Sequence, residues 1–280
     1  MKMVLVQGSH SPRVRRKQRA RRAAILDTAM HLVARRGIDG LTLQAIAEAL
    51  DYSVGALYRY FPSKGVLVAE LQRGVIRVLD AQIRLLWERC DGWLVRERAE
   101  GPEPPAVVAL LPLVALPSFY GHVASAVPEQ FALLADSLGD PRQLIEDPDA
   151  RRVFDDARSL FGRTAARFEE AARAGALASG DPLRRPLVLW ASMHGVVQLR
   201  KLSRIDPVLI DTGAMLAALV EALFLGWGAD RSALERARQI LADSDLAALP
   251  LVAADFAASP AAPVELRQLN ESDSNAKEVV

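Results

Sequence analysis

The segment from Thr42 to Lys64 gathers side chains that could bind a polyanion. It offers the hydroxyl groups of Thr42 and Tyr58, the guanidinium group of Arg59 and the ammonium group of Lys64. Hydroxyl and ammonium groups are suitable donors to phosphate oxygens, and an arginine can donate two hydrogen bonds to the edge of one guanine. The chemistry expected from this segment is therefore noncovalent recognition of nucleic acid.

Two short helices must position these side chains. Thr42 is a good N-cap for the first helix, and residues 51–52 are suited to a tight turn after it. Ser53 then caps a second helix that reaches Tyr60, and Pro62 ends it because the residue before a proline avoids helical geometry. The buried seam between the two helices is expected to consist of Ala45, Ile46, Ala49, Leu57 and Phe61.

This arrangement predicts a helix-turn-helix. The second helix is expected to expose Val54, Gly55, Tyr58 and Arg59, and it is short enough to lie in a major groove ~12 Å wide. A generic helical hairpin would have the same seam, so the geometry alone leaves both interpretations open.

Residues 20–70 resemble the tetracycline-repressor (TetR, AcrR-type) family, whose pattern is Thr-x-x-x-Ile-Ala-x-x-x-Gly-x-Ser-x-x-x-Leu-Tyr-x-x-Phe-x-x-Lys. The matching residues are Thr42, Ile46, Ala47, Ser53, Leu57, Tyr58, Phe61 and Lys64, and Gly37 also matches after the first helix. Asp51 stands where the family usually has the turn glycine. Because aspartate tolerates left-handed backbone geometry better than most residues, we expect the turn to persist.

The resemblance implies a role for each side chain of the motif. It implies that Thr42, Tyr58 and Lys64 contact phosphates, with Ser53 at the start of the recognition helix. It also implies that Gln44, Val54, Gly55, Ala56, Arg59 and Tyr60 face the groove or its edge. The alternatives are a packed aromatic for Tyr58 and a solvated helix start for Lys64. A cation is unfavourable at a helix N-terminus, so a phosphate partner would explain Lys64.

The charge of the chain is divided between a basic start and an acidic remainder. Residues 1–65 contain twelve Lys and Arg against four Asp and Glu, although the whole chain has a net charge of only +1. Seven basic residues fall within positions 13–22. This pattern fits either a polyanion partner for the start of the chain or a solvated terminus. We expect residues 1–17 to be a flexible basic arm that adds phosphate contacts or remains solvated.

The rest of the chain predicts an all-α protein. After the helix-turn-helix domain at 18–65, with its first helix over 18–36, a larger helical domain for effector binding and dimerisation is expected at 66–245. A long helix from Lys64 to about Cys90 opens it, because its apolar residues recur at helical spacing. Further helices are expected at about 106–125, 128–138, 148–177, 183–203, 207–227 and 230–244. Residues 246–280 are expected to be a loosely ordered tail.

Two later segments are almost free of charge. Residues 186–199 and 207–220 carry a single charge, on Asp211, and a helix that is apolar on all sides must be covered on all sides. A four-helix interface between two copies is predicted, in the place where the family dimerises; a central helix pair in a monomer is the alternative. The segment Trp190 to Gly195 also resembles a Trp…His-Gly motif found in one branch of the family.

The segment from Pro104 to Pro128 contains no Asp, Glu, Lys or Arg over 25 residues. Its prolines favour a buried, kinked helix over a membrane span, so no membrane partner is expected. Aromatic and histidine side chains here and in neighbouring segments could line a cavity for an apolar effector. The candidates are Phe119, Tyr120, His122, Phe131, Phe161, Trp190 and His194. Ordinary core packing is the alternative for each.

These features predict a transcription regulator rather than an enzyme. The expected function is sequence-specific repression by a homodimer on palindromic or near-palindromic operator DNA, from which a small apolar effector releases it. A helical architectural DNA-binding protein without an effector, or a helical enzyme, is the alternative. The four histidines lack metal-type spacing, so no catalytic residue, metal or cofactor is expected. The single cysteine, Cys90, fits a cytoplasmic location.

Overall fold

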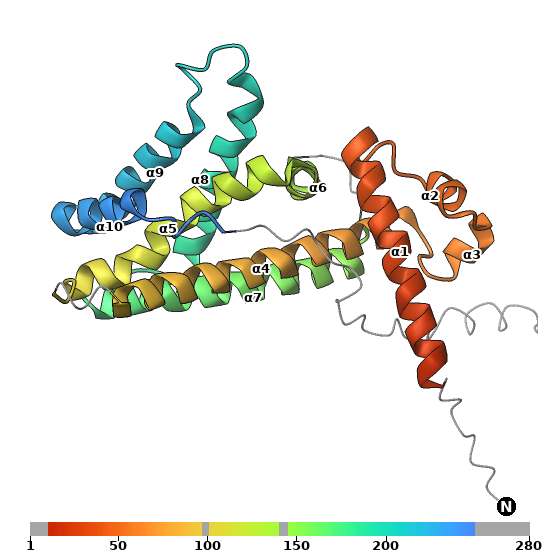
Figure 1. Cartoon of the computed structure of the whole chain (residues 1–280), viewed down its shortest axis with the longest axis horizontal. Helices are drawn as coiled ribbons and strands as arrows, with labels where there is room; N and C mark the ends of the chain where they lie inside the picture. Colours follow the sequence, from red (N-terminus) through yellow and green to blue (C-terminus); the bar gives the residue numbers. More distant parts are fainter. Residues whose placement is uncertain (1–10, 97–100, 140–144, 250–280) are drawn as a thin grey trace, which may run out of the picture.

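A computed structural model describes residues 11–96, 101–139 and 145–249, and within these ranges it contains helices and no strand. Three helices form a head at one end: α1 (Pro12–Arg36), α2 (Leu43–Leu50) and α3 (Val54–Tyr58). The long α4 (Lys64–Arg96) leads from this head along the body, side by side with α7 (Asp147–Arg173) (Figure 1). The remaining α-helices complete the body: α5 (Pro105–Ala126), α6 (Pro128–Gly139), α8 (Arg184–Gln198), α9 (Thr212–Gly226) and α10 (Arg231–Asp243). A short 3-10 helix, η2 (Leu199–Leu202), follows α8. The all-α prediction is confirmed for the described residues.

The first helix begins earlier than the sequence analysis expected. It starts at Pro12 rather than at residue 18, so residues 12–17 are helical and not a flexible arm. Proline is favoured in the first helical turn, and the Arg, Lys, Gln and Ala residues that follow have high helix propensity. Residues 1–10 of the predicted arm lie outside the described residues. The helix ends at Gly37 with φ 68°, as its glycine predicts.

The core of the head reaches beyond the three head helices. Ile25, Ile46, Leu57 and Phe61 are fully buried in it, and α6 adds one more side chain, that of Leu133. The first turns of α4 contribute Leu67, Val68, Leu71 and Val75 to the same cluster. The expected boundary at residues 65 and 66 therefore falls where α4 starts, and the head depends on apolar side chains that follow this boundary.

The uncharged α5 is a core helix of the body. It is the one helix of the described residues that is long and apolar enough to cross a membrane, but 61% of that apolar window is buried inside the protein. It packs against α10, α7 and α9, and it contains Pro112 and Pro117. The carbonyl oxygen of Pro112 accepts a hydrogen bond of 3.1 Å from Nε1 of Trp87 on α4.

The end of the body differs from the sequence prediction in two places. Helix α9 starts at Thr212, not at residue 207, because Asp206 caps a turn by accepting hydrogen bonds from the backbone N–H groups of residues 208 and 209. Leu246 and Leu249, expected in a loosely ordered tail, are buried in the core of the body. Residues 250–280 of that tail lie outside the described residues.

Ion pairs join α4 to α7 along their length. Arg73 pairs with Asp156, and Arg167 pairs with Asp91, each with an N–O distance of 2.8 Å. At the head, Arg22 of α1 pairs with Glu70 of α4 at 3.0 Å. Partly exposed pairs contribute only about 0–1 kcal/mol each, so they orient these helices more than they stabilise them.

Candidate functional site

Side-chain hydroxyl groups cap the N-termini of α2 and α3 in the head. The Thr42 Oγ1 atom accepts a hydrogen bond from the N–H of Ala45 at 3.0 Å, and the Ser53 Oγ atom accepts one from the N–H of Ala56 at 3.2 Å. Asp51 between them has φ 54° and ψ 44°, the left-handed geometry that the turn requires. The prediction that aspartate supports this turn is confirmed.

One face of α3 is buried and the opposite face is exposed. Leu57 and the following Phe61 are fully buried, whereas Tyr58 is 52% exposed and Val54, Gly55 and Arg59 are also exposed. An exposed Tyr58 rules out the packed-aromatic alternative. Ala56 and Tyr60 are half-buried at the edge of this face. We call the surface of Val54, Gly55, Tyr58 and Arg59 the recognition face.

Helix α2 turns a different face inward from the one expected. Ala49 is exposed, and the buried residues are Leu43, Ile46 and Ala47. Ala49 is three residues after Ile46 and was expected to share its face, but the helix rotates to bury the larger Leu43. Thr42 and Gln44 are exposed at the start of α2, and Gln44 Nε2 donates to Glu48 Oε1 at 3.1 Å.

Lys64 has a partner within the protein. Its Nζ atom donates a hydrogen bond of 2.7 Å to the main-chain carbonyl oxygen of Ile38, so its ammonium group ties the start of α4 to the turn after α1. A phosphate partner is therefore not needed to explain the presence of this lysine, and Lys64 is not a merely solvated helix start. An ammonium group has three N–H donors, so one bond leaves two for another acceptor.

Five of the seven predicted ligand-binding side chains lie together in the body. The ring of His194 is stacked on Phe131 with centroids 5.3 Å apart and lies 5.5 Å from Trp190, which in turn contacts Phe161 at 5.6 Å. The hydroxyl of Tyr120 lies 2.9 Å from His194 Nδ1. Burial lowers the pKa of His194 and raises the pKa of Tyr120, so both groups are neutral at pH 7.

The other two predicted ligand-binding residues do not join this cluster. Phe119 is fully buried in the core of the body. His122 is exposed, and its Nε2 atom lies 3.2 Å from the carbonyl oxygen of Leu249. The uncharged stretch around His122 is a helix, and His122 lies on an outward-facing turn of it, beside the main chain of Leu249.

A small cavity lies between α4, α5 and α6, beside Tyr120 and Phe131. Its volume is about 20 Å³. Two buried glutamines, Gln82 of α4 and Gln130 of α6, line it among apolar side chains. The other lining residues are Val75, Val78, Leu79, Val123, Val127 and Leu134. We call this space the Gln82 cavity.

Comparison with known proteins decides the family of the head. The model of the family described as bacterial regulatory proteins, tetR family, matches residues 25–71, which are the second half of α1, all of α2 and α3 and the start of α4. Residues 25–71 therefore form a domain of the tetR family. The resemblance inferred from the Thr42–Lys64 motif is thereby confirmed.

Relatives of this chain match it over the length of about one domain. The HTH-type transcriptional repressor KstR of Mycobacterium tuberculosis is 44% identical over 62 residues, which are 22% of this chain and 28% of the repressor. KstR of Mycolicibacterium smegmatis is also 44% identical over 62 residues. The match therefore spans less than a third of the length of these relatives.

Solved structures extend the likeness from the head to the fold of the chain. A protein of unknown function from Rhodococcus sp. RHA1 has a TM-score of 0.51 at 21% identity, covering 81% of this chain and 99% of that one. SmeT, the repressor of the Stenotrophomonas maltophilia multidrug efflux pump SmeDEF, has a TM-score of 0.51 at 18% identity, covering 76% and 92%. At these identities the likeness concerns the helical fold.

Sequence reasoning missed the two buried glutamines of the Gln82 cavity. Gln82 lies in the apolar stripe of α4, between Leu79 and Ile83, where a polar residue interrupts the helical pattern. That interruption was the available signal. Within the described residues, no group of three His, Cys, Asp or Glu side chains could hold a metal ion. Burial raises the pKa of Cys90 to about 12, which keeps its thiol protonated.

Proposed function

We propose that this chain is a cytoplasmic, sequence-specific DNA-binding transcription regulator, a repressor that a small apolar effector releases from its operator. The observation that carries the proposal is the recognition face, which exposes Tyr58 and Arg59 from a helix anchored by the buried Leu57 and Phe61. A helix presented in this way fits the major groove. The repressor activity of relatives that share the head supports the same function. No catalytic residue or cofactor takes part in it.

The contacts to DNA divide into positioning and reading. The hydroxyl groups of Thr42 and Tyr58 and the remaining donors of Lys64 bind phosphates, while Ser53 caps the helix that enters the groove. The side chains of Gln44, Val54, Ala56, Arg59 and Tyr60, together with Gly55, face base edges or the groove rim. Phosphate contacts fix the register of the protein, and base contacts specify the sequence.

Removing single contacts should separate these two roles. Lys64→Ala should lower affinity for all duplexes about tenfold and reduce the salt slope by about one, since one charged phosphate contact is lost. Arg59→Ala should cost about 1–3 kcal/mol on the preferred duplex and change which base is tolerated there. Fluorescence anisotropy with a duplex enriched from a random pool by the unaltered protein measures both effects.

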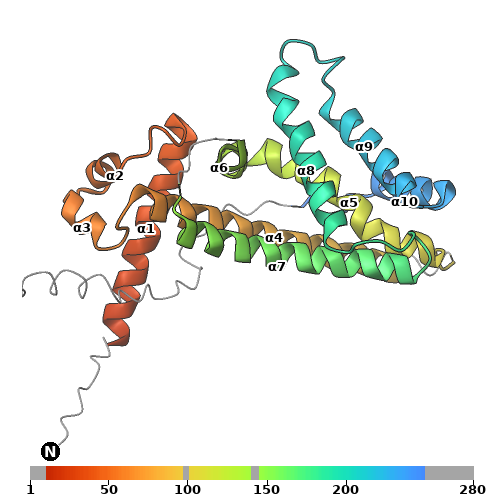
Figure 2. The same cartoon turned by 180° about the vertical axis from the view of Figure 1, so that it is seen from behind.

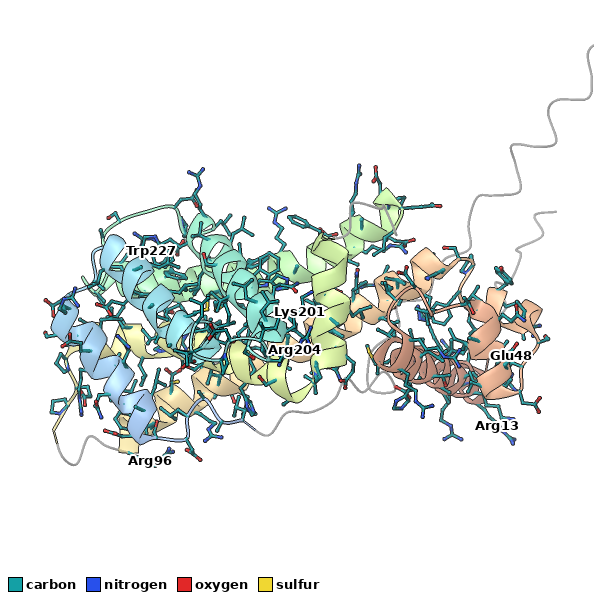
Figure 3. The ribbon with its side chains drawn as sticks, turned by 90° about the horizontal axis from the view of Figure 1, so that it is seen from above. Arg13, Glu48, Arg96, Lys201, Arg204 and Trp227 are labelled. Atoms are coloured by element: carbon teal, nitrogen blue, oxygen red, sulfur yellow. The ribbon has the colours of Figure 1, made fainter. Side chains whose placement is uncertain are left out.

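The matched control for these variants is Arg96→Ala, which removes an exposed arginine from the end of α4, far from the head (Figure 3). Its affinity and salt slope should equal those of the unaltered protein. If Lys64→Ala behaves like this control, Lys64 only ties α4 to Ile38, and its phosphate role is refuted.

An uncovered apolar face on α8, α9 and their connection supports a homodimer. The connection projects away from the rest of the body (Figures 1 and 2), and in it Val208 is 90% exposed and Leu209 is 72% exposed. Leu187 and Val188 of α8 are also exposed. Exposed small residues on the two helices would allow close approach: Ala191, Gly195, Gly213, Ala214 and Ala218. Contiguous exposed apolar surface is typical of interfaces.

Two copies joined at this face would present two recognition helices to one operator. For a helix-turn-helix dimer these lie one DNA turn apart, ~34 Å, on a palindromic or near-palindromic site. The effector would bind at the aromatic cluster of Tyr120, Phe131, Trp190 and His194, together with Phe161. It must bind the DNA-incompetent state more tightly than the competent one, because equal affinity would shift nothing.

A further inference from the structure

The Gln82 cavity contains a hydrogen-bond donor that has no partner. We infer that the effector is an uncharged, mainly apolar molecule with an oxygen acceptor, such as a carbonyl, that the amide of Gln82 binds. The inference rests on the proposed function in one respect, namely that the body binds an effector. It adds the chemical class of that effector and the side chain that selects it.

The side-chain amide of Gln82 is buried and has a hydrogen-bond donor without an acceptor. Its side chain is only 7% exposed, and its Nε2 atom is buried without a hydrogen-bond partner. Buried polar atoms are nearly always bonded, and an orphaned one destabilises the protein. Because Gln82 lines the cavity, its unpaired N–H group can donate a hydrogen bond to an acceptor atom of a ligand that enters the cavity. Tyr120, which lines the cavity from α5, already has His194 as its partner.

The lining also excludes a charged effector. Two glutamines, Tyr120 and apolar side chains form the wall, and none of the lining residues is Lys, Arg, Asp, Glu or His. A carboxylate placed there would lose its hydration without gaining a cation, and such burial is strongly unfavourable. The Gln82 amide can stabilise a neutral oxygen instead.

The size of the cavity indicates which wall must move. A volume of about 20 Å³ holds one water molecule, so an effector must enlarge the cavity. Helix α6 is the shortest of the three walls, with 12 residues against 33 in α4 and 22 in α5. It presents Gln130 and Phe131 to the cavity and Leu133 to the core of the head. An effector at Gln82 therefore displaces the helix that also supports the head.

Three probes of similar size test the inference on the full chain without DNA. Acetophenone has a ketone, ethylbenzene has no polar atom and benzoate has a charge. We expect acetophenone to bind about tenfold more tightly than ethylbenzene, as one neutral hydrogen bond allows. Benzoate should not bind. Dissociation constants from ligand-detected NMR give the order, and this series needs no variant.

The variant Gln82→Met removes the amide and keeps the length of the side chain. It should lower acetophenone affinity to that of ethylbenzene and leave ethylbenzene affinity unchanged. Arg84→Met is the control, because it changes an exposed position on the same helix. It should preserve the tenfold preference.

Three results would overturn the inference: no probe binds, ethylbenzene binds as tightly as acetophenone, or benzoate binds. In the first case the amide is satisfied by a single water molecule. The effect of the probes on operator affinity is a separate measurement, and it tests effector release rather than the binding site. A ketone preference that depends on Gln82, without any change in operator affinity, supports the binding site and contradicts effector release instead.

Discussion

Gly195→Arg is expected to convert the proposed dimer into a monomer and to weaken operator binding by about 10²–10⁴-fold, because each head would then bind alone. Gly195 lies exposed on α8, and a Cβ atom added there would meet no atom within 4 Å. The protomer therefore accommodates the arginine. In the dimer, the same substitution places two cations and their bulk in an interface made of small apolar residues.

The control for this experiment is Gly162→Arg on α7. Gly162 is also exposed within a helix, and a Cβ atom there meets nothing within 4 Å. The two variants thus share helix propensity and charge but differ in the face they change. Light scattering at micromolar concentration should give a monomer mass for the first and a dimer mass for the second. Two dimer masses would refute the assignment of the interface to α8 and α9.

Leu133→Ala is expected to destabilise the protein by about 2–5 kcal/mol, the range for a fully buried leucine that leaves a cavity. Leu133 is 0% exposed and belongs to the core of the head, although α6 is a helix of the body. Urea unfolding followed by circular dichroism gives the free energy of unfolding. The loss of the Leu133 side chain should also weaken any effect of an effector on DNA binding, because α6 would then make fewer contacts with the core of the head.

Leu85→Ala is the matched control, since Leu85 of α4 is exposed and its truncation leaves no buried cavity. It should change the free energy of unfolding by less than about 0.5 kcal/mol. Equal losses in both variants would show that Leu133 does not support the head from α6.

The parts of the fold that depend on neighbouring residues were predictable from the sequence. Thr42 and Ser53 cap their helices, Asp51 takes the left-handed turn and Gly37 ends α1, as expected. Each of these features is fixed by side-chain chemistry within three or four residues along the chain. The exposure of the recognition face also follows from helical spacing, once Leu57 and Phe61 are assigned to the core.

Features that depend on distant residues could not be predicted in the same way. Lys64 bonds to the carbonyl of Ile38, 26 residues earlier, and the exposed His122 lies beside the main chain of Leu249, 127 residues later. The rotation of α2 that exposes Ala49 depends on packing against α1. The Gln82 cavity is formed by three helices, and only the folded arrangement shows that its amide is left without a partner.

The shared core of the head and α6 determines how this protein can be recombined with its relatives. The tetR-family match ends at residue 71, but the head is also packed by Val75 and by Leu133 from far along the chain. If the head were joined to the body of a relative at residue 65, it would keep its recognition face. It would lose the apolar side chains of α4 and α6 that complete its core, and the body of the relative need not supply equivalent ones. A working chimaera should be joined beyond Val75 and should bring a matching residue at position 133. The packing unit of the head is therefore discontinuous in the sequence. Exchange of the head between relatives during evolution requires a matching substitution in α6.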